Sequence, residues 1–209
     1  TAGWQIAPAL CAGNAVVLKP SELTPLTSLA LGLLCDRAEG MPRGLVSVLA
    51  GAGPTTGAAA VAHPDTRLVV FVGSAEAGAQ IAAAAARAIV PSVLELGGKS
   101  PNIVFADADL DRALIGAQAA IFGGAGQSCV AGSRLLVHRS IHASFVERLS
   151  HAAARIPVGA PTDPATQIGP INNRRQRDKI AGMVEAAASA GATIAAGGAC
   201  PASLRDTGG

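Results

Sequence analysis

Short apolar runs, rich in Val and Leu, alternate along the chain with Ala-rich segments that carry helix signals. Four runs have the length and composition of buried strands, namely residues 15–18, 45–49, 68–72 and 93–96. Helices are predicted between them at residues 26–38 and 75–88, and a short helix that ends near residue 62 is predicted after a Gly-rich loop at 51–54. Thr24 and Pro25 fit the N-cap and the first position of the first helix. Because strands and helices alternate, the order predicts a parallel, doubly wound α/β sheet, which binds ligands where its strands end.

The pattern restarts after Gly97 and Gly98. Strands are predicted at residues 102–105, 135–138 and 192–195, and helices at 109–122, 140–156 and 173–190. Asp109 and Ser140 fit the N-caps of two of these helices. We therefore predict two α/β domains, with residues 1–97 in the first and 98–209 in the second.

Composition excludes several classes of protein. Hydrophobic residues make up 50% of the chain and charged residues 14%, so the chain is not intrinsically disordered. The formal net charge is +2 and the basic residues form no block, which argues against a nucleic-acid or membrane-surface partner. No apolar run approaches the roughly 20 residues of a membrane span.

The four cysteines are Cys11, Cys35, Cys129 and Cys200. They have no CxxC spacing and no neighbouring His, so the sequence predicts neither a disulfide framework nor a metal site. Together with the lack of a recognisable signal peptide, this pattern predicts a cytoplasmic protein.

Cys129 is the first candidate for chemistry. It follows the Gly-rich segment 123–126, and a thiol at such a backbone bend can be held as a thiolate nucleophile. The alternative is a small buried apolar residue, which is the usual role of cysteine and the one expected for Cys11, Cys35 and Cys200.

Glu95 is the second candidate. It ends an apolar strand and precedes Gly97 and Gly98, so we expect a desolvated carboxylate that is suited to general-base work. The alternative is an exposed carboxylate at a strand end that takes part in a salt bridge.

Two turns after strands are candidates for cofactor binding. Lys19 and Glu22 follow the first strand, where an ammonium and a carboxylate can both reach sugar hydroxyls; the alternative is a charge pair at a helix start. Gly73 and Ser74 lead from a strand into a helix, whose N-terminus favours anions. Neither turn is a GxGxxG fingerprint.

Taken together, these motifs resemble the NAD(P)-dependent aldehyde dehydrogenase superfamily, collinearly along the chain. The motifs that carry the resemblance are Lys19-Pro20-Ser21-Glu22, Phe71-Val72-Gly73-Ser74, Leu94-Glu95-Leu96-Gly97-Gly98-Lys99, Gly126-Gln127-Ser128-Cys129 and Gly169-Pro170 with Gln176 and Lys179. The chain is similar to an internal part of such an enzyme, covering part of a Rossmann-like cofactor domain and part of the catalytic domain.

The resemblance implies a mechanism. Cys129 would attack the aldehyde carbonyl, hydride would pass to the nicotinamide, and Glu95 would activate the water that hydrolyses the thioester. It also implies a set of cofactor-binding residues, namely Lys19, Ser21, Glu22, Gly53, Gly73, Ser74, Leu96, Gly97, Gln176 and Lys179. Because Glu22 would repel a 2′-phosphate, the expected cofactor is NAD, with NADP as the alternative.

Two other functions stay open. One is a truncated module that binds a nucleotide without catalysis. The other is a CoA-acylating semialdehyde dehydrogenase, a branch that generally lacks the general-base carboxylate, so Glu95 counts against it. The resemblance further implies a small-molecule aldehyde as substrate and a homo-oligomeric full-length parent.

Overall fold

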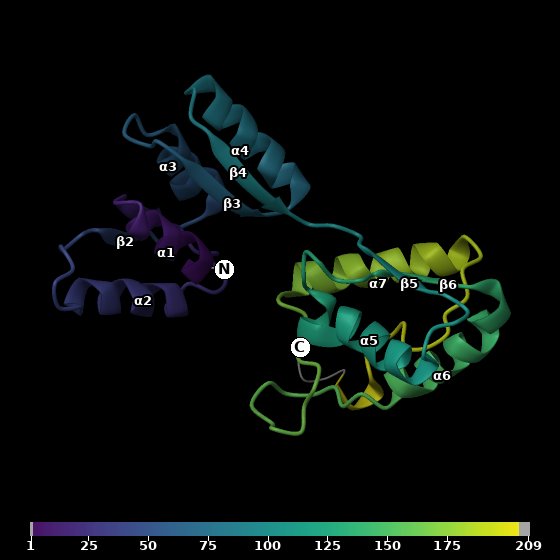
Figure 1. Ribbon diagram of the computed structural model, residues 1–209. Helices are drawn as coiled ribbons and strands as arrows, with labels where there is room; N and C mark the ends of the chain where they lie inside the picture. The colour runs from purple at the N-terminus through teal and green to yellow at the C-terminus, as the bar shows by residue number, and fades with distance from the viewer. Residues whose placement is uncertain (1, 205–209) are drawn as a thin grey trace. The chain divides into compact units, whose positions relative to one another are not determined.

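The computed structural model describes residues 2–204 (Figure 1). The chain divides into two compact units, of which the first ends at Leu96 and the second begins at Gly97. Both belong to the α/β class, and every ladder between their strands is parallel, as the alternating pattern predicted.

The first unit contains two strand pairs and the helices around them. Its strands are β1 (Val16–Leu18), β2 (Val46–Val48), β3 (Val69–Gly73) and β4 (Ser92–Leu96). Its helical elements are α1 (Ala2–Cys11), α2 (Leu26–Arg37), a π-helical turn η1 (Gly53–Gly57), α3 (Ala58–Ala62) and α4 (Ala75–Arg87). β1 pairs with β2 and β3 pairs with β4, but no described ladder joins the two pairs. The strands that were predicted to form one doubly wound sheet therefore form separate parallel pairs.

One face of the β3–β4 pair forms the core of this unit. Val69 is buried with Val61 of α3 and Ala85 of α4. Leu96 lies so close to α4 that a Cβ on Gly78 would stand 2.6 Å from its Cδ2 atom. Because side chains alternate across a strand, the residues next to these in sequence point to the opposite face.

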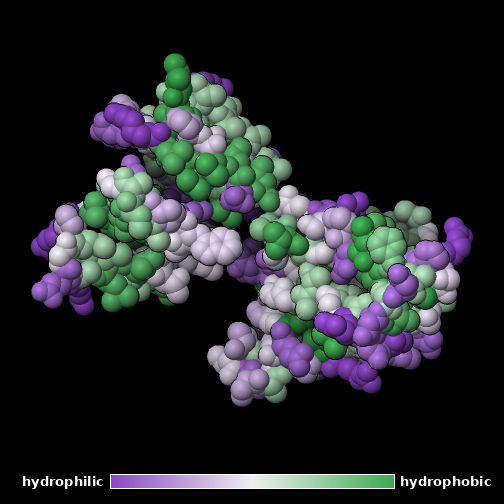
Figure 2. Space-filling model, in the orientation of Figure 1, coloured by the Kyte–Doolittle hydropathy of each residue, from purple (hydrophilic) through white to green (hydrophobic). Residues whose placement is uncertain are grey.

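The opposite face of the β3–β4 pair is exposed. Val70, Val72 and Val93 on this face are 40%, 43% and 46% exposed. Figure 2 shows apolar side chains on the surface in the region of β3 and β4. Parallel strands are normally covered on both faces, so this apolar face is unusual for its strand type.

The second unit packs two helices against one strand pair. It contains β5 (Pro101–Val104), α5 (Leu110–Phe122), a 3₁₀ turn η2 (Gly123–Gly126), β6 (Arg134–Val137), a 3₁₀ turn η3 (Arg139–Ile141), α6 (His142–Ala154), α7 (Arg174–Ser189) and a last turn η4 (Ala202–Leu204). Val104, Ala117 and Phe145 form its buried centre, which joins β5, α5 and α6. Arg148 of α6 also forms an ion pair with Asp111 of α5.

Several element boundaries differ from the predicted ones. Helix α1 was not predicted, and it accommodates Pro8 in its interior. Residues 192–195 form no strand, since no described segment pairs with them. Ser140 does not cap α6, because it lies in η3, where its N–H donates to Nδ1 of His138.

The N-cap of helix α2 lies one residue later than predicted. Its N-cap is Pro25, and no side chain caps it, whereas Thr24 lies in the preceding turn and donates to the Ser21 carbonyl. Beyond α2, Arg43 pairs with Asp36 at 3.0 Å. The hydrogen bond and charge of Arg43 hold the pKa of the Asp36 carboxyl below its ordinary value.

The accessible surface is large for the mass. It is 14243 Å², whereas two separate compact bodies of half this mass would expose about 10,700 Å² in total. The uncovered face of β3–β4 contributes to this excess, together with exposed apolar side chains elsewhere in both units. In the described part of the chain, six of the nine buried apolar residues lie in two small clusters, and Ile6, Val46 and Ala131 are buried outside them.

Ile89 is expected to be a destabilising residue. It follows α4 with φ +55° and is 92% exposed. Its N–H donates to Ala86 and that of Val90 donates to Ala85, which is a Schellman turn, where Gly or Asn is preferred. Ile89→Gly should therefore raise the free energy of unfolding by about 1 kcal/mol, measured by urea unfolding followed by circular dichroism. Ile115→Gly, at an exposed position inside α5, should lower it; a loss of stability in Ile89→Gly would contradict the prediction.

Candidate active site

Cys129 lies after a left-handed turn at the end of α5. Gly124, Ala125 and Gly126 have φ values of 58°, 55° and 72°. Glycine adopts this backbone conformation without a steric penalty, which explains two of the three residues. The turn reverses the chain beyond Phe122 and leaves Cys129 exposed.

The backbone next to Cys129 lies close to the segment before β5. A Cβ on Gly98 would stand 3.1 Å from the carbonyl oxygen of Cys129, so only glycine fits there without a shift. Further along, Arg134 donates from Nε to the Lys99 carbonyl at 2.8 Å and from its backbone N–H to the Ser100 carbonyl at 3.2 Å. The Gly97-Gly98-Lys99 motif and the Cys129 motif are therefore in direct contact within the second unit.

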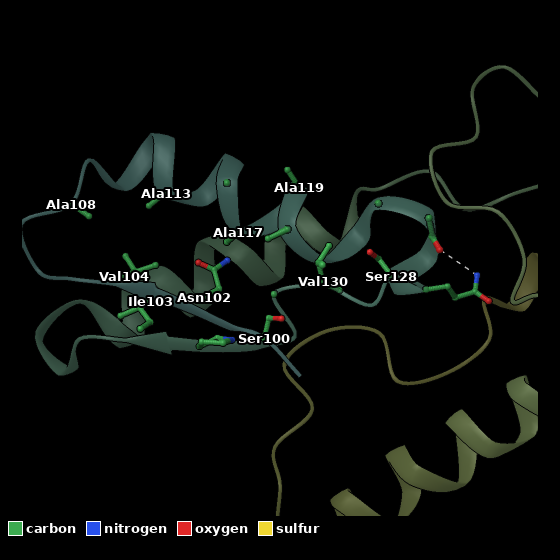
Figure 3. A pocket seen from close by; sticks show the side chains of 18 residues that line it. Ser100, Asn102, Ile103, Val104, Ala108, Ala113, Ala117, Ala119, Ser128 and Val130 are labelled. Atoms are coloured by element: carbon green, nitrogen blue, oxygen red, sulfur yellow. Dashed lines mark hydrogen bonds between the residues drawn. The ribbon is translucent and has the colours of Figure 1, made fainter. Parts of the chain in front are cut away.

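A hollow of about 810 Å³ lies beside the Cys129 turn (Figure 3). Its walls come from β5, α5 and the turn, and include Ile103, Val104, Ala113, Ala117, Ser128 and Val130. Ser128 and Val130 flank Cys129 in sequence. None of the lining residues, all of which lie in the described part of the chain, is charged. The hollow therefore suits an uncharged, largely apolar group.

Glu95 does not have the buried environment that was predicted. It lies on β4 opposite Val72, on the open face of the β3–β4 pair, and it is exposed. The prediction was wrong because an apolar strand was taken to be covered on both faces. Glu95 belongs to the first unit, whereas Cys129 belongs to the second.

Lys19 and Glu22 do come together after β1. Nζ of Lys19 lies 3.8 Å from Oε2 of Glu22, with Lys19 partly buried and Glu22 exposed. The same Nζ donates to the carbonyls of Pro20 and Gly51, at 2.6 and 2.9 Å. Lys19 thus holds the turn after β1 against the turn after β2. Gly51 was not among the predicted cofactor-binding residues, although its place in a Gly-rich turn after a strand was the available signal.

Gly73 and Ser74 connect β3 to α4. The Ser74 side chain caps α4 by accepting from the Ala77 N–H at 3.2 Å. Gly73 pairs in register with Leu96, and a Cβ on Gly73 would stand 2.5 Å from the ring of Phe71. This end of the β3–β4 pair is therefore a tight turn followed by a capped helix of 13 residues.

The other predicted cofactor residues are distributed over both units. Ser21 accepts from the Leu23 N–H in a local turn, and Gly53 begins η1. Gly97 begins the second unit. Gln176 and Lys179 lie on α7, whose N-cap Asn173 accepts from the Gln176 N–H at 2.9 Å.

All four cysteines are free thiols. Among residues 2–204, no cluster of three or more His, Cys, Asp or Glu side chains could hold a metal ion. Across the same residues, no helix has both the length and the apolar character that crossing a bilayer requires.

Several solved structures match this chain both in fold and in sequence. PnpE from Pseudomonas sp. WBC-3 matches with a TM-score of 0.92 and 42% identity, over 95% of this chain and 41% of that one. PnpE has also been solved in complex with nicotinamide adenine dinucleotide. Betaine aldehyde dehydrogenase from Staphylococcus aureus, in complex with NAD⁺, matches with a TM-score of 0.93 and 41% identity, over 98% of this chain and 40% of that one.

Sequence relatives agree with these structures. Retinal dehydrogenase 2 from Rattus norvegicus is 48% identical over 93% of this chain and 38% of its own length. Chloroplastic betaine aldehyde dehydrogenase from Beta vulgaris is 44% identical over 98% of this chain and 41% of its own length. The chain thus spans about two fifths of the relatives that it matches. The model of the aldehyde dehydrogenase family matches residues 1–208. The chain belongs to the aldehyde dehydrogenase family.

Proposed function

We propose that this chain carries the nucleophile and the general base of an enzyme that oxidises an aldehyde to a carboxylic acid with NAD. The observation that supports this most directly is the family match over residues 1–208, which includes both the Glu95 and the Cys129 motifs. The exposed position of Cys129 after a left-handed turn agrees with a nucleophile, since a thiol in this role has to meet its substrate.

The proposed chemistry is covalent. The Cys129 thiolate adds to the aldehyde carbonyl and forms a thiohemiacetal, whose collapse to a thioester releases hydride. NAD, when bound, accepts this hydride. Glu95 then takes a proton from water, and the resulting hydroxide releases the acid and restores the thiol. The backbone N–H of Cys129 donates to the oxyanion in both addition steps.

The cofactor-binding part of the proposal rests on the first unit. An ammonium and a carboxylate 3.8 Å apart at the end of β1 supply a donor and an acceptor, which fits a pair of ribose hydroxyls. The capped N-terminus of α4 after Gly73 is suited to a phosphate. Lys19, Glu22, Gly73 and Ser74 are therefore proposed to hold NAD.

The test is aldehyde-dependent formation of NADH by the full-length parent, with calorimetric titration of NAD into the 209-residue chain. We expect NADH formation by the parent and saturable NAD binding by the chain. If the parent forms no NADH with any of a panel of aliphatic, aromatic and polar aldehydes, the proposal fails.

A second function, nucleotide binding without turnover, is favoured for the chain alone. The Lys19–Glu22 pair lies wholly within the first unit, and the chain spans about two fifths of its relatives. NAD binding without NADH formation by the 209-residue chain would support it. A CoA-acylating reaction is disfavoured by Glu95 and would appear as acyl-CoA product. A cytoplasmic location and a homo-oligomeric parent complete the proposal.

The proposed role of Glu22 predicts a preference for NAD over NADP. Its carboxylate would repel a 2′-phosphate. Glu22→Gln should therefore lower the ratio of kcat/KM for NAD to kcat/KM for NADP by about fivefold, which corresponds to the repulsion of roughly 1 kcal/mol between two unit charges in water. The measurement is kcat/KM of the full-length parent for both cofactors. Glu39→Gln, which removes another exposed carboxylate from the same unit, should leave the ratio unchanged. Equal kcat/KM for the two cofactors in the unaltered enzyme would refute the prediction.

A further inference from the structure

Gln127 makes two side-chain hydrogen bonds beside the proposed nucleophile. It lies two residues before Cys129, and its Nε2 donates to the Gly124 carbonyl at 3.2 Å, drawn as the dashed line in Figure 3. Its Oε1 accepts from the backbone N–H of Asn172 at 3.1 Å. The amide thus closes the left-handed turn with one end and contacts a segment 45 residues away with the other.

The distant segment begins a long helix. Asn172 immediately precedes Asn173, whose side chain caps α7 by accepting from the Gln176 N–H at 2.9 Å. The Asn173 carbonyl also accepts from the Arg177 N–H. The backbone fixed by Gln127 is therefore the backbone from which α7 starts. Two residues of α7, Gln176 and Lys179, are in the set predicted to contact the cofactor.

The amide group of Gln127 takes part in both hydrogen bonds. Its Nε2 is a second donor to the Gly124 carbonyl, which also accepts from the Gln127 backbone N–H at 3.1 Å, and its Oε1 is the acceptor for the Asn172 N–H. A carboxylate of the same length supplies only the acceptor, and a thioether of similar size supplies neither at comparable strength. The three side chains therefore separate the two hydrogen bonds experimentally.

We propose that Gln127 is a positioning residue that fixes the Cys129 turn to the start of α7. The thiol and the first turn of α7 then keep their places together, and a ligand that orders one of them also orders the other. This inference rests on the proposed role of Cys129 as the nucleophile. It adds that a side chain outside the reacting atoms sets the position of that nucleophile.

The first test is hydrogen exchange in the 209-residue chain. Gln127→Met should speed exchange at the Asn172 and Gln176 amides by about tenfold, the order of effect of one lost hydrogen bond. Gln127→Glu keeps the acceptor and should restore protection at both amides. The control is Gln118→Met, because Gln118 bonds only within α5, to the Leu114 carbonyl, and should leave both amides protected. Unchanged exchange at Asn172 and Gln176 in Gln127→Met would overturn the proposal.

The second test is the rate at which iodoacetamide alkylates Cys129, relative to Cys200 in the same molecule. Gln127→Met should lower this ratio by about threefold or more, because a misplaced thiol reacts more slowly. Its urea midpoint should equal that of the Gln118→Met control, so that the loss of reactivity does not reflect unfolding. A ratio equal to that of the unaltered chain would overturn the positioning role. If Cys129 reacts no faster than Cys200 in the unaltered chain, the proposed nucleophile is wrong, whereas the exchange result still decides whether Gln127 couples the two segments.

Discussion

Cys129→Ala is expected to abolish aldehyde oxidation by the full-length parent and to leave NAD binding nearly intact. In the proposed mechanism the thiol forms the covalent bond to the substrate, whereas the residues proposed to hold NAD lie elsewhere in the chain. Loss of a nucleophile typically lowers kcat by at least about a thousandfold. The measurements are NADH absorbance with saturating aldehyde and calorimetric titration of NAD.

Cys200→Ala is the matched control, since Cys200 is another exposed thiol of the second unit. It should keep full activity. Iodoacetamide should label Cys129 faster than Cys11, Cys35 or Cys200, and aldehyde turnover should fall in step with the labelling of Cys129. Faster labelling of any other cysteine, or residual activity of Cys129→Ala above a few per cent, would contradict the assignment.

Glu95→Gln is expected to separate the two halves of the reaction. In the proposed mechanism, acylation and hydride transfer need the Cys129 thiolate, whereas hydrolysis of the thioester needs a base. The variant should therefore give a stoichiometric burst of NADH followed by turnover that is slower by about a hundredfold, a typical contribution of a general base. Stopped-flow absorbance of NADH in the full-length parent measures both phases.

Two other outcomes would give Glu95 a different role. Loss of the burst together with turnover would mean that Glu95 chiefly activates Cys129. Unchanged turnover would mean that Glu95 is an exposed carboxylate at a strand end, as its accessibility in the first unit would allow. Glu39→Gln should change neither phase.

Local sequence signals predicted most elements of the fold. The Val-rich runs became strands because β-branched side chains pack well on a parallel pair. Asp109 caps α5 as predicted, because a short polar side chain before an amphipathic segment satisfies the free N–H groups of the first turn. Asn173, which was predicted only as the first residue of the last long helix, caps α7 in the same way.

Features that depend on partners distant in sequence could not be predicted. Residues 192–195 have the composition of a strand, but a strand also needs a neighbour, and composition does not supply one. Likewise, the apolar sequence around Glu95 indicated burial without indicating what would cover it. The bond between Gln127 and Asn172 joins two segments whose spacing carries no periodic signal, and only the folded backbone brings them together.

The three strand pairs of this chain each consist of two strands only. Every strand therefore has one edge whose backbone N–H and C=O groups have no ladder partner among the described strands, and such edges readily accept a further extended segment. On the β3–β4 pair, these edges border the exposed Val70, Val72 and Val93. In concentrated solution the chain should consequently self-associate through these strand edges, so that its apparent stability depends on protein concentration.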